Sequence, residues 1–281
     1  MNIYDIAKLA NVSIATVSRV VNNSPKVSPK TKEKVLAVMK ENEYTPNAFA
    51  RGLGLGSMKT VGIICPNIDD IYMAKAVSYL EQNLHAHGYD CILGCSGFKQ
   101  EEKEDYVRLL LSKKIDTLIL VGSTYAGNGK DESDTDYIRE AAEQVSIFMI
   151  NAKVSGDNIY CTYADDFQAT YEVTKAFIRR GKEKILFMYD SESYSARQKM
   201  AGYEAALQDA GYPIRGNLKF KTKNDIEYTR DMLLEYNRTL DFDSVLATED
   251  GIAIGAVKYA KIKGLAIPEE LAVVGYNNSI L

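Results

Sequence analysis

The sequence predicts an α/β protein, with a small all-α head and a body of alternating strands and helices. First, the opening 44 residues hold three short amphipathic segments, each preceded by a helix-capping residue. Second, from Val61 onward, short apolar runs alternate with amphipathic segments, as in a parallel sheet covered by helices on both faces. Third, the 281 residues are 46% hydrophobic and 26% charged, which is typical of a globular chain of one or two domains.

The head is expected to contain three helices separated by tight turns. Asn2, Ser13 and Ser28 precede them as caps, and Pro29 suits the first position of the third helix. Asn11 tolerates the left-handed backbone of the first turn. The apolar residues of the three helices are Ile6, Leu9, Ala10, Val17, Val20, Val21, Val35, Leu36, Val38 and Met39. Three short helices with a tight turn between the first two fit a helix-turn-helix module over residues 1–45.

Residues 46–60 are interpreted as a linker, because Gly52, Gly54 and Gly56 make an isolated helix marginal in water. The body is expected to begin at residue 61. Most of its strands are continuous apolar runs, and they are expected at 61–65, 90–95, 116–121, 146–150, 185–189, 244–247 and 271–274. Amphipathic helices are expected at 72–87, 100–114, 167–180, 196–210 and 251–263.

Charge is distributed unevenly along the chain. Residues 1–60 hold nine Lys or Arg and four Asp or Glu, a net charge of +5. The whole chain carries −4, so the remaining 221 residues carry −9. A basic head on an acidic body indicates that the head binds a polyanion and that the body does not.

Several classes of protein are disfavoured. No run of about 18 apolar residues predicts a membrane span, and the N-terminus has no signal-peptide pattern, so we expect a cytoplasmic protein. The four cysteines are expected to be buried small apolar side chains, and not metal ligands or disulfides. The two histidines, His85 and His87, lie together, and we find no catalytic Ser, Cys or His constellation. We therefore expect no enzyme activity, no metal and no cofactor.

Residues 3–22 resemble the DNA-binding headpiece of the lactose-repressor (LacI/GalR-type) family of bacterial transcription regulators. The specific part of the match is Val12-Ser13, then Thr16-Val17-Ser18-Arg19-Val20, then Asn22. Residues 44–53 are similar to the hinge helix of that family, and the resemblance extends through the body. It implies a head at 1–45, a hinge and linker at 46–60, and an effector-binding body at 61–281.

The resemblance also implies which residues contact DNA. With Val17, Val20 and Val21 facing inward, Ile14, Ala15 and Arg19 are left on the outer face, where the family reads bases. Arg19 would read a guanine, whereas Ser13, Thr16, Asn22 and Thr31 would hold phosphates. The full implied set is Tyr4, Ser13, Ile14, Ala15, Thr16, Arg19, Asn22, Thr31, Asn47, Ala50 and Leu53.

Leu53 has a distinct implied role in the hinge. In this family, a leucine from each of two paired hinge helices enters the minor groove and opens a base step. The three neighbouring glycines suggest a hinge that is disordered until DNA and a partner subunit order it. The alternative is that Leu53 is a passive apolar residue of the linker.

For the body, the resemblance implies a periplasmic-binding-protein-like sensor with lobes at about 61–161 and 162–281. Its effector-binding residues would be Tyr72, Arg197, Asp250 and Asn277. Tyr72 would stack on a sugar, and a guanidinium with a carboxylate suits a polyhydroxylated ligand. The alternatives are core packing for Tyr72, and a surface pair or cap for Arg197 and Asp250. Because the chain ends at Leu281, the final segment of the family is expected to be absent.

These observations predict a homodimeric transcription regulator that binds double-stranded operator DNA. We expect a repressor of a carbohydrate-utilisation operon, controlled by a sugar-type effector that shifts the angle between lobes. One alternative is a regulator whose corepressor is a purine or phosphosugar. A free solute-binding protein would need an export signal and no basic head. A sugar-processing enzyme would need a paired acid and base, which we do not find.

Overall fold

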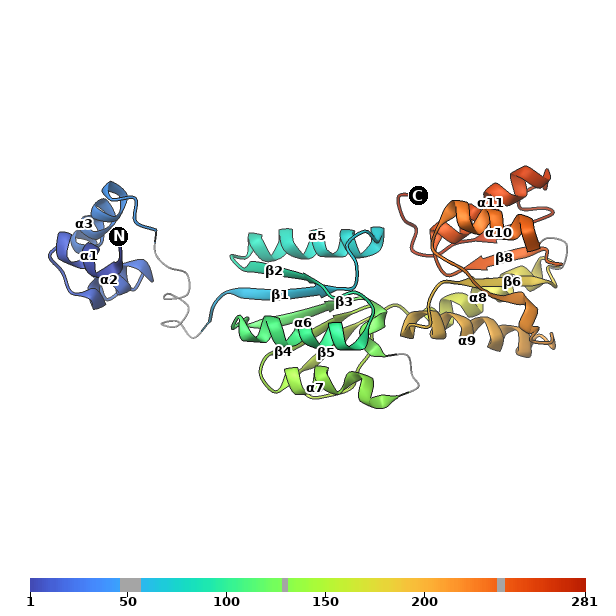
Figure 1. Ribbon diagram of the computed structural model, residues 1–281, viewed down its shortest axis with the longest axis horizontal. Helices are drawn as coiled ribbons and strands as arrows, with labels where there is room; N and C mark the ends of the chain where they lie inside the picture. The colour runs from blue at the N-terminus through green and yellow to red at the C-terminus, as the bar shows by residue number, and fades with distance from the viewer. Residues whose placement is uncertain (46–56, 128–130, 237–240) are drawn as a thin grey trace.

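The computed structural model describes residues 1–45, 57–127, 131–236 and 241–281 (Figure 1). Three packed units follow one another along the chain: an all-α head and two α/β lobes. All strand pairs within the lobes are parallel. The predicted α/β class is therefore confirmed, with an all-α head in front of it.

The head consists of α1 (Ile3–Leu9), α2 (Ile14–Val21) and α3 (Pro29–Glu41). The predicted caps are confirmed: the side chains of Asn2, Ser13 and Ser28 each accept a hydrogen bond from the first turn of the helix that follows. Asn11 has a φ of 47°, as expected for the turn between α1 and α2. Seven buried residues form the core of the head: Ile6, Ala7, Ala10, Val17, Val20, Val35 and Met39.

Two leucines grouped with the apolar residues of the head are instead on its surface. Leu9 is 54% exposed and Leu36 is 45% exposed. Leu9 directly precedes the buried Ala10, and Leu36 directly follows the buried Val35. One residue step turns a helix by about 100°. That rotation carries both leucines off the buried stripe.

The first lobe contains a sheet in the order β2-β1-β3-β4-β5. Helix α5 (Ile71–Ala86) packs on one face, and α6 (Gln100–Ser112) and α7 (Asp136–Ala142) pack on the other (Figure 1). Short 3₁₀ helices at Ser123–Ala126 and Glu132–Thr135 follow β3. The strands are β1 (Thr60–Cys65), β2 (Asp90–Cys95), β3 (Thr117–Val121), β4 (Ser146–Ile150) and β5 (Ile159–Thr162).

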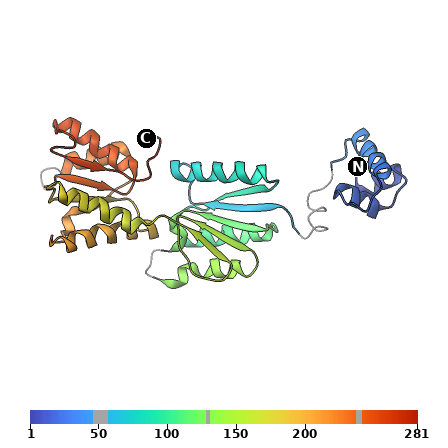
Figure 2. The same ribbon diagram turned by 180° about the vertical axis from the view of Figure 1, so that it is seen from behind.

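The second lobe has a smaller sheet in the order β7-β6-β8-β9. Helices α8 (Asp166–Arg179) and α9 (Tyr194–Asp209) cover one face, and α10 (Ile226–Tyr236) and α11 (Asp250–Lys263) cover the other (Figure 2). A 3₁₀ helix at Gly216–Leu218 precedes the strand at the edge. The strands are β6 (Ile185–Tyr189), β7 (Lys219–Lys221), β8 (Ser244–Ala247) and β9 (Ala272–Val274).

All seven predicted strands are present within one residue of their expected bounds, and two further strands were not predicted. Both of the missed strands, β5 and β7, lie at sheet edges. The other two edge strands, β2 and β9, were predicted, so edge position alone does not explain the difference. β5 and β7 are only four and three residues long, and Lys219-Phe220-Lys221 and the alternating Ile159–Thr162 lack a continuous apolar run.

The expectation that the cysteines are buried is wrong for one of them. Cys65 is buried on the inner strand β1, and Cys91 and Cys161 are half-buried, but Cys95 is exposed. Its strand β2 is the edge of the first sheet, and α5 covers only part of that edge. All four thiols are free.

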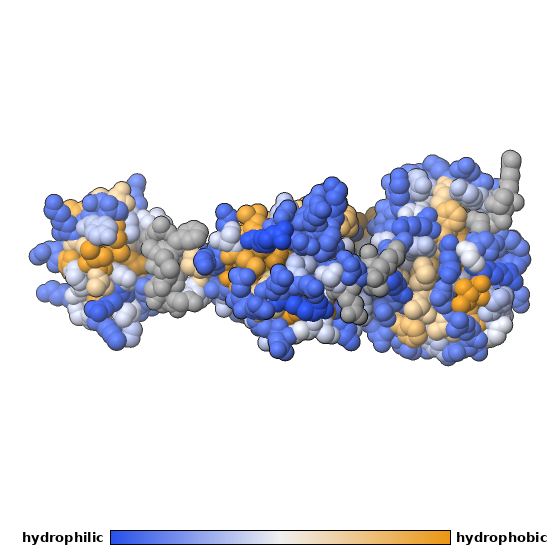
Figure 3. Space-filling model, turned by 60° about the horizontal axis from the view of Figure 1, so that its bottom comes forward, coloured by the Kyte–Doolittle hydropathy of each residue, from blue (hydrophilic) through white to orange (hydrophobic). Residues whose placement is uncertain are grey.

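The outer face of β4 and β5 also exposes apolar side chains. Phe148 and Tyr160 stack there with ring centroids 5.0 Å apart, and both remain exposed. Elsewhere the surface in Figure 3 is largely hydrophilic, with apolar patches between the polar side chains.

Asp116 fixes the start of the body to the first lobe. Its two carboxylate oxygens accept hydrogen bonds from Met58 N (3.0 Å) and Thr60 N (2.9 Å), while Asp116 N donates to Thr60 O (2.8 Å). The chain that leaves the head is therefore held by the loop before β3 as soon as it reaches residue 58.

Candidate functional site

Helix α2 presents the predicted DNA-reading residues on the surface of the head. Ile14, Ala15 and Arg19 are exposed, whereas Val17 and Val20 on the opposite face are buried. The residue spacing therefore gives α2 one packed face and one free face, as a helix in the major groove requires. Whether these three side chains read bases stays a prediction.

The residues proposed to hold phosphates lie at helix ends of the head. Ser13 Oγ caps α2 by accepting from Thr16 N (3.1 Å), and its hydroxyl lies 2.9 Å from that of Thr16. Thr31 makes the same contact with Ser28 at the start of α3. Asn22 ends α2, and its Oδ1 is buried without a hydrogen-bond partner among the described residues.

Four further predicted contacts complete this set. Tyr4 is exposed on α1. Asn47, Ala50 and Leu53 lie outside the described residues, so the hinge and its proposed leucine wedge remain predictions.

A cleft of about 980 Å³ lies between the two lobes, at the carboxyl ends of their strands. Its walls come from the segments after β1, β3, β6, β8 and β9. Open parallel sheets bind ligands at this edge, because the loops that follow the strands converge there. The cleft is therefore the candidate ligand site.

Three of the four predicted effector-binding residues line this cleft: Tyr72, Asp250 and Asn277. Asn277 Nδ2 donates to Glu249 Oε2 (2.7 Å), and Asp250 Oδ2 accepts from Ser279 N (2.6 Å). Both contacts tie the end of the chain to the start of α11.

Arg197 does not line the cleft, although Ala196 and Lys199 on the same helix do. Its Nη1 donates to the carbonyl oxygens of Glu192 (2.9 Å) and Gly127 (3.3 Å). Gly127 belongs to the first lobe and Glu192 to the second, so the guanidinium connects the lobes at the rim of the cleft. A role in effector binding stays a prediction for all four residues.

Lys199 lies at the second-lobe wall of the cleft and is only 3% exposed. Its Nζ donates to Thr248 O (3.1 Å), lies 4.0 Å from Glu249 Oε1 and stands 3.7 Å above the ring centre of Tyr276. The Tyr276 hydroxyl in turn donates to Asp166 (2.5 Å), which is buried. The pKa of Lys199 is lowered, because the effect of burial outweighs that of the surrounding carboxylates, which raise it.

Two carboxyl groups beside Lys199 are also perturbed. Burial raises the pKa of Asp190, and it raises the pKa of Glu249 to about 8. Lys199 lowers both values, but Asp70 from the first lobe raises both. Acidic groups of both lobes therefore repel one another across the cleft.

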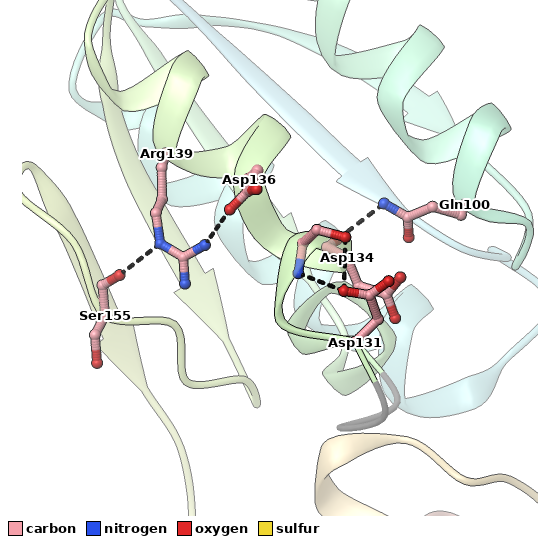
Figure 4. Close-up of polar contacts among 7 residues, drawn as sticks. Gln100, Asp131, Asp134, Asp136, Arg139 and Ser155 are labelled. Carbon is pink, nitrogen blue, oxygen red and sulfur yellow. Dashed lines mark hydrogen bonds and ion pairs between the residues drawn. The ribbon is translucent and has the colours of Figure 1, made fainter.

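The first lobe contributes a second buried lysine to the cleft. Lys103 on α6 donates to Thr124 O (3.1 Å), and burial lowers its pKa. Figure 4 shows the neighbouring loop, where Gln100 Nε2 donates to Asp134 O (2.9 Å) and Asp131 Oδ1 accepts from the backbone and side chain of Ser133. These bonds fix the loop at the margin of the cleft.

Arg139 on α7 makes a separate set of surface contacts nearby. Its Nη1 pairs with Asp136 Oδ1 (2.7 Å), and its Nε donates to Ser155 O (3.2 Å) (Figure 4). The pair is exposed, so it orders the surface and contributes little to stability.

Several residues of the cleft were not predicted from the sequence, chiefly Phe98, Asp190, Lys199 and Glu249. A signal existed for two of them, because Asp190 directly follows the apolar strand β6 and Glu249 lies two residues after β8. No signal existed for Lys199, since a lysine on an amphipathic helix is normally solvated. Among the described residues, no cluster of three His, Cys, Asp or Glu is placed to hold a metal ion.

Glu249 makes the stability of the second lobe depend on pH. Its folded-state pKa of about 8 lies above the usual 4.5, so the folded protein binds the extra proton between these values. Stability therefore falls as pH rises across this window. We expect Glu249→Gln to unfold like the unaltered protein near pH 4.5, and to be more stable above about pH 8 by on the order of 2 kcal/mol.

Thermal unfolding at several pH values measures this difference. Glu235→Gln, an exposed position on α10, is the matched control and should follow the unaltered protein throughout. The interpretation fails if Glu249→Gln and the unaltered protein keep a constant difference in Tm across the window. The groups that face Glu249 are Lys199, Asp190, Asp250 and Asp70.

An exposed helix on a small helical head, joined to two α/β lobes around a cleft, is the arrangement expected of a ligand-responsive DNA-binding regulator. The comparison with known families agrees. Residues 2–47 match the bacterial regulatory proteins of the lacI family, and residues 58–279 match the periplasmic binding proteins and sugar binding domain of the LacI family. The chain belongs to the LacI family, and it is a sequence-specific DNA-binding transcription regulator with a sugar-binding-type domain.

Individual relatives are transcription regulators. The chain is 48% identical to an HTH-type transcriptional regulator of Lachnoclostridium phytofermentans, over all of this chain and 84% of that protein. It is 30% identical to the catabolite control protein A of Priestia megaterium, over all of this chain and 83% of that protein.

Solved structures share the fold. The lac repressor dimer bound to operator and the anti-inducer ONPF has a TM-score of 0.86 at 23% identity, over 100% of this chain and 83% of that one. The transcriptional regulator CelR in complex with cellobiose has a TM-score of 0.65 at 24% identity, over 99% of this chain and 83% of that one. In the described part of the chain, no helix has the length and apolar character needed to span a membrane.

Proposed function

We propose that this chain is a homodimeric repressor of carbohydrate-utilisation genes, controlled by a sugar-type effector in the cleft between its lobes. The observation that carries the proposal is the pairing of the two sites: an exposed reading helix in the head and a polar cleft in the body. The acidic body and basic head fit this division, because only the head has the charge to approach DNA. A cytoplasmic location, where the chromosome lies, is part of the proposal.

In the proposed mechanism the head reads DNA through α2. Arg19 donates to a guanine, Ile14 and Ala15 contact thymine methyl groups, and the hydroxyls at the starts of α2 and α3 contact phosphates. The effector acts on the angle between the lobes. Arg197 is suited to report that angle, since it contacts carbonyl oxygens of both lobes. A change of angle alters the spacing of two heads and so their fit to two half-sites.

A dimer is supported by exposed apolar side chains on neighbouring elements of the first lobe. Tyr79 on α5 and Leu93 on β2 are both largely exposed, and α5 packs against β2. Helix-turn-helix regulators bind as dimers to two half-sites about one helical turn apart, so an exposed surface of this kind is expected in each protomer.

The direct test is selection of DNA from a random pool by the purified chain, combined with light scattering. We expect a dimer in solution and an enriched sequence with two inverted half-sites. Monosaccharides titrated into the DNA-binding assay then distinguish an inducer, which lowers operator affinity, from a corepressor, which raises it. No enriched sequence, or a monomer that binds a single half-site, would contradict the proposal.

A further inference from the structure

We propose that the effector carries a primary ammonium group on a hydroxylated frame, as an amino sugar does, and that this group lies between Asp70, Asp190 and Glu249. The inference rests on the proposed function, because it assigns a chemical class to the effector of the same cleft. It follows from the charges that line the cleft, from how those charges are already partnered, and from an unpartnered hydroxyl in the wall.

The cleft is strongly acidic. Among the described residues that line it, nine are Asp or Glu and two are Lys. Two of the outer acids are neutralised by surface cations, Glu192 by Lys221 and Glu227 by Lys258 and Arg230. Deeper in the cleft, Asp190, Glu249 and Asp250 surround one cation among the described residues, Lys199. Asp70 on the opposite wall accepts a hydrogen bond from Met73 N (2.9 Å).

Neither lysine of the cleft is free to bind an anionic ligand. Lys199 is engaged by Thr248 O, by Glu249 and by the face of Tyr276. Lys103 is buried and donates to Thr124 O. A phosphate or carboxylate on the effector would therefore meet carboxylates without a compensating cation, and its desolvation would be uncompensated.

Asp70, Asp190 and Glu249 come from both lobes and act on one another. Asp70 caps α5 in the first lobe, Asp190 follows β6, and Glu249 precedes α11 in the second lobe. Like charges on opposite walls favour an open cleft. An ammonium group between them replaces repulsion by attraction and favours the ionised form of Glu249, whose pKa is otherwise raised to about 8. It then provides hydrogen-bond donors to all three carboxylates. The same contact that recognises the effector thus draws the lobes together.

Ser195 supplies the independent sign of a bound ligand. It lines the cleft, is 4% exposed, and its hydroxyl has no hydrogen-bond partner among the described residues. A buried hydroxyl without a partner is unfavourable, and a ligand hydroxyl satisfies it. Tyr72 and Phe98 at the cleft provide aromatic faces for the ring of a sugar. The frame of the ligand is therefore hydroxylated, in addition to carrying the amine.

The first experiment uses the full chain and matched ligands. Glucosamine, galactosamine and mannosamine are compared with glucose, galactose and mannose, and with their N-acetyl and 6-phosphate derivatives, by thermal shift and calorimetry. We expect at least one amino sugar to raise Tm and to bind at least about tenfold more tightly than its neutral parent, because a hydrogen bond between charged groups is stronger than one between neutral groups. Its N-acetyl derivative should lose this advantage.

The second experiment locates the ammonium. Asp70→Asn keeps an N-cap for α5, since Asn caps as well as Asp, and Glu249→Gln keeps the size of the side chain. Each is expected to abolish the preference for the amine. Asp157→Asn removes the same charge from an exposed position of the first lobe that does not line the cleft, and it should retain the preference.

Three results would overturn the proposal: equal or tighter binding of neutral or phosphorylated sugars, no shift in Tm with any amino sugar, or an equal loss in Asp157→Asn. A neutral sugar that binds and changes operator affinity leaves the proposed function in place and removes only this inference. An amino sugar that binds without any effect on DNA binding supports the inference and contradicts the proposed regulation.

Discussion

Arg19→Ala is expected to weaken binding to the selected operator by about 5- to 150-fold, which corresponds to about 1–3 kcal/mol. The physical reason is the position of Arg19 on the free face of α2, opposite the buried Val17 and Val20. A guanidinium donates two parallel hydrogen bonds to a guanine, and alanine leaves those acceptors unpaired. Fluorescence anisotropy on operator and on random DNA, at one fixed salt concentration, measures the effect.

Lys40→Ala provides the control for charge. Lys40 is exposed in the last turn of α3, so this variant removes one positive charge from the head without altering α2. It should reduce affinity for operator and random DNA to the same small extent, as phosphate contacts do. If Arg19→Ala shows equal losses on both DNAs, Arg19 is a phosphate contact and the proposed reading of bases is wrong.

We expect Gly202→Ala to lower the free energy of unfolding by about 1–3 kcal/mol or more. The reason is that the added methyl group forces α8 and α9 apart. A Cβ at this position would lie 2.1 Å from the backbone oxygen of Phe167 and 2.4 Å from Thr170 Oγ1. The backbone cannot yield as a flexible side chain can. Thr170 also donates to Lys199 O (2.8 Å) across the same contact, so separating the helices disturbs the cleft residues on α9.

Thermal unfolding followed by circular dichroism measures this loss, and ligand titration measures its effect on the cleft. Gly216→Ala is the matched control, because nothing lies within 4 Å of a Cβ there. That variant should stay within about 0.5 kcal/mol of the unaltered protein. Similar Tm values for the two variants would mean that the α8–α9 contact is not as tight as described.

The inner strands of both sheets were predictable because each is buried on two faces and so leaves an uninterrupted apolar run. The edge strands β2 and β9 were predictable as well, since each still holds a run of apolar residues. The edge strands β5 and β7 were not, since they are four and three residues long and polar residues interrupt their apolar ones. The head was predictable in more detail, because the N-cap residues Asn2, Ser13 and Ser28 mark the start of each helix. The buried faces of α1 and α3 were predicted less well than that of α2, because Leu9 and Leu36 are exposed.

The cleft was less predictable than the fold. Tyr72, Asp250 and Asn277 follow strand ends and were found through their place in the family pattern. Lys199 was missed because its function depends on burial, which the sequence of an amphipathic helix does not reveal. The acidity of the cleft depends likewise on the approach of Asp70 to Asp190 and Glu249, three residues far apart in sequence.

The hydrogen bonds of Asp116 to Met58 and Thr60 set the length of the tether between head and body. Even fully extended, the chain from Thr45 to Ser57 spans at most roughly 40 Å. In the proposed dimer, once one head occupies its half-site, the second is confined near a half-site about 34 Å away. Its effective concentration there is then in the millimolar range, so a head of weak intrinsic affinity still binds. If the Asp116 carboxylate no longer held Met58 N and Thr60 N, the tether would be longer. The effective concentration of the second head at its half-site would then fall.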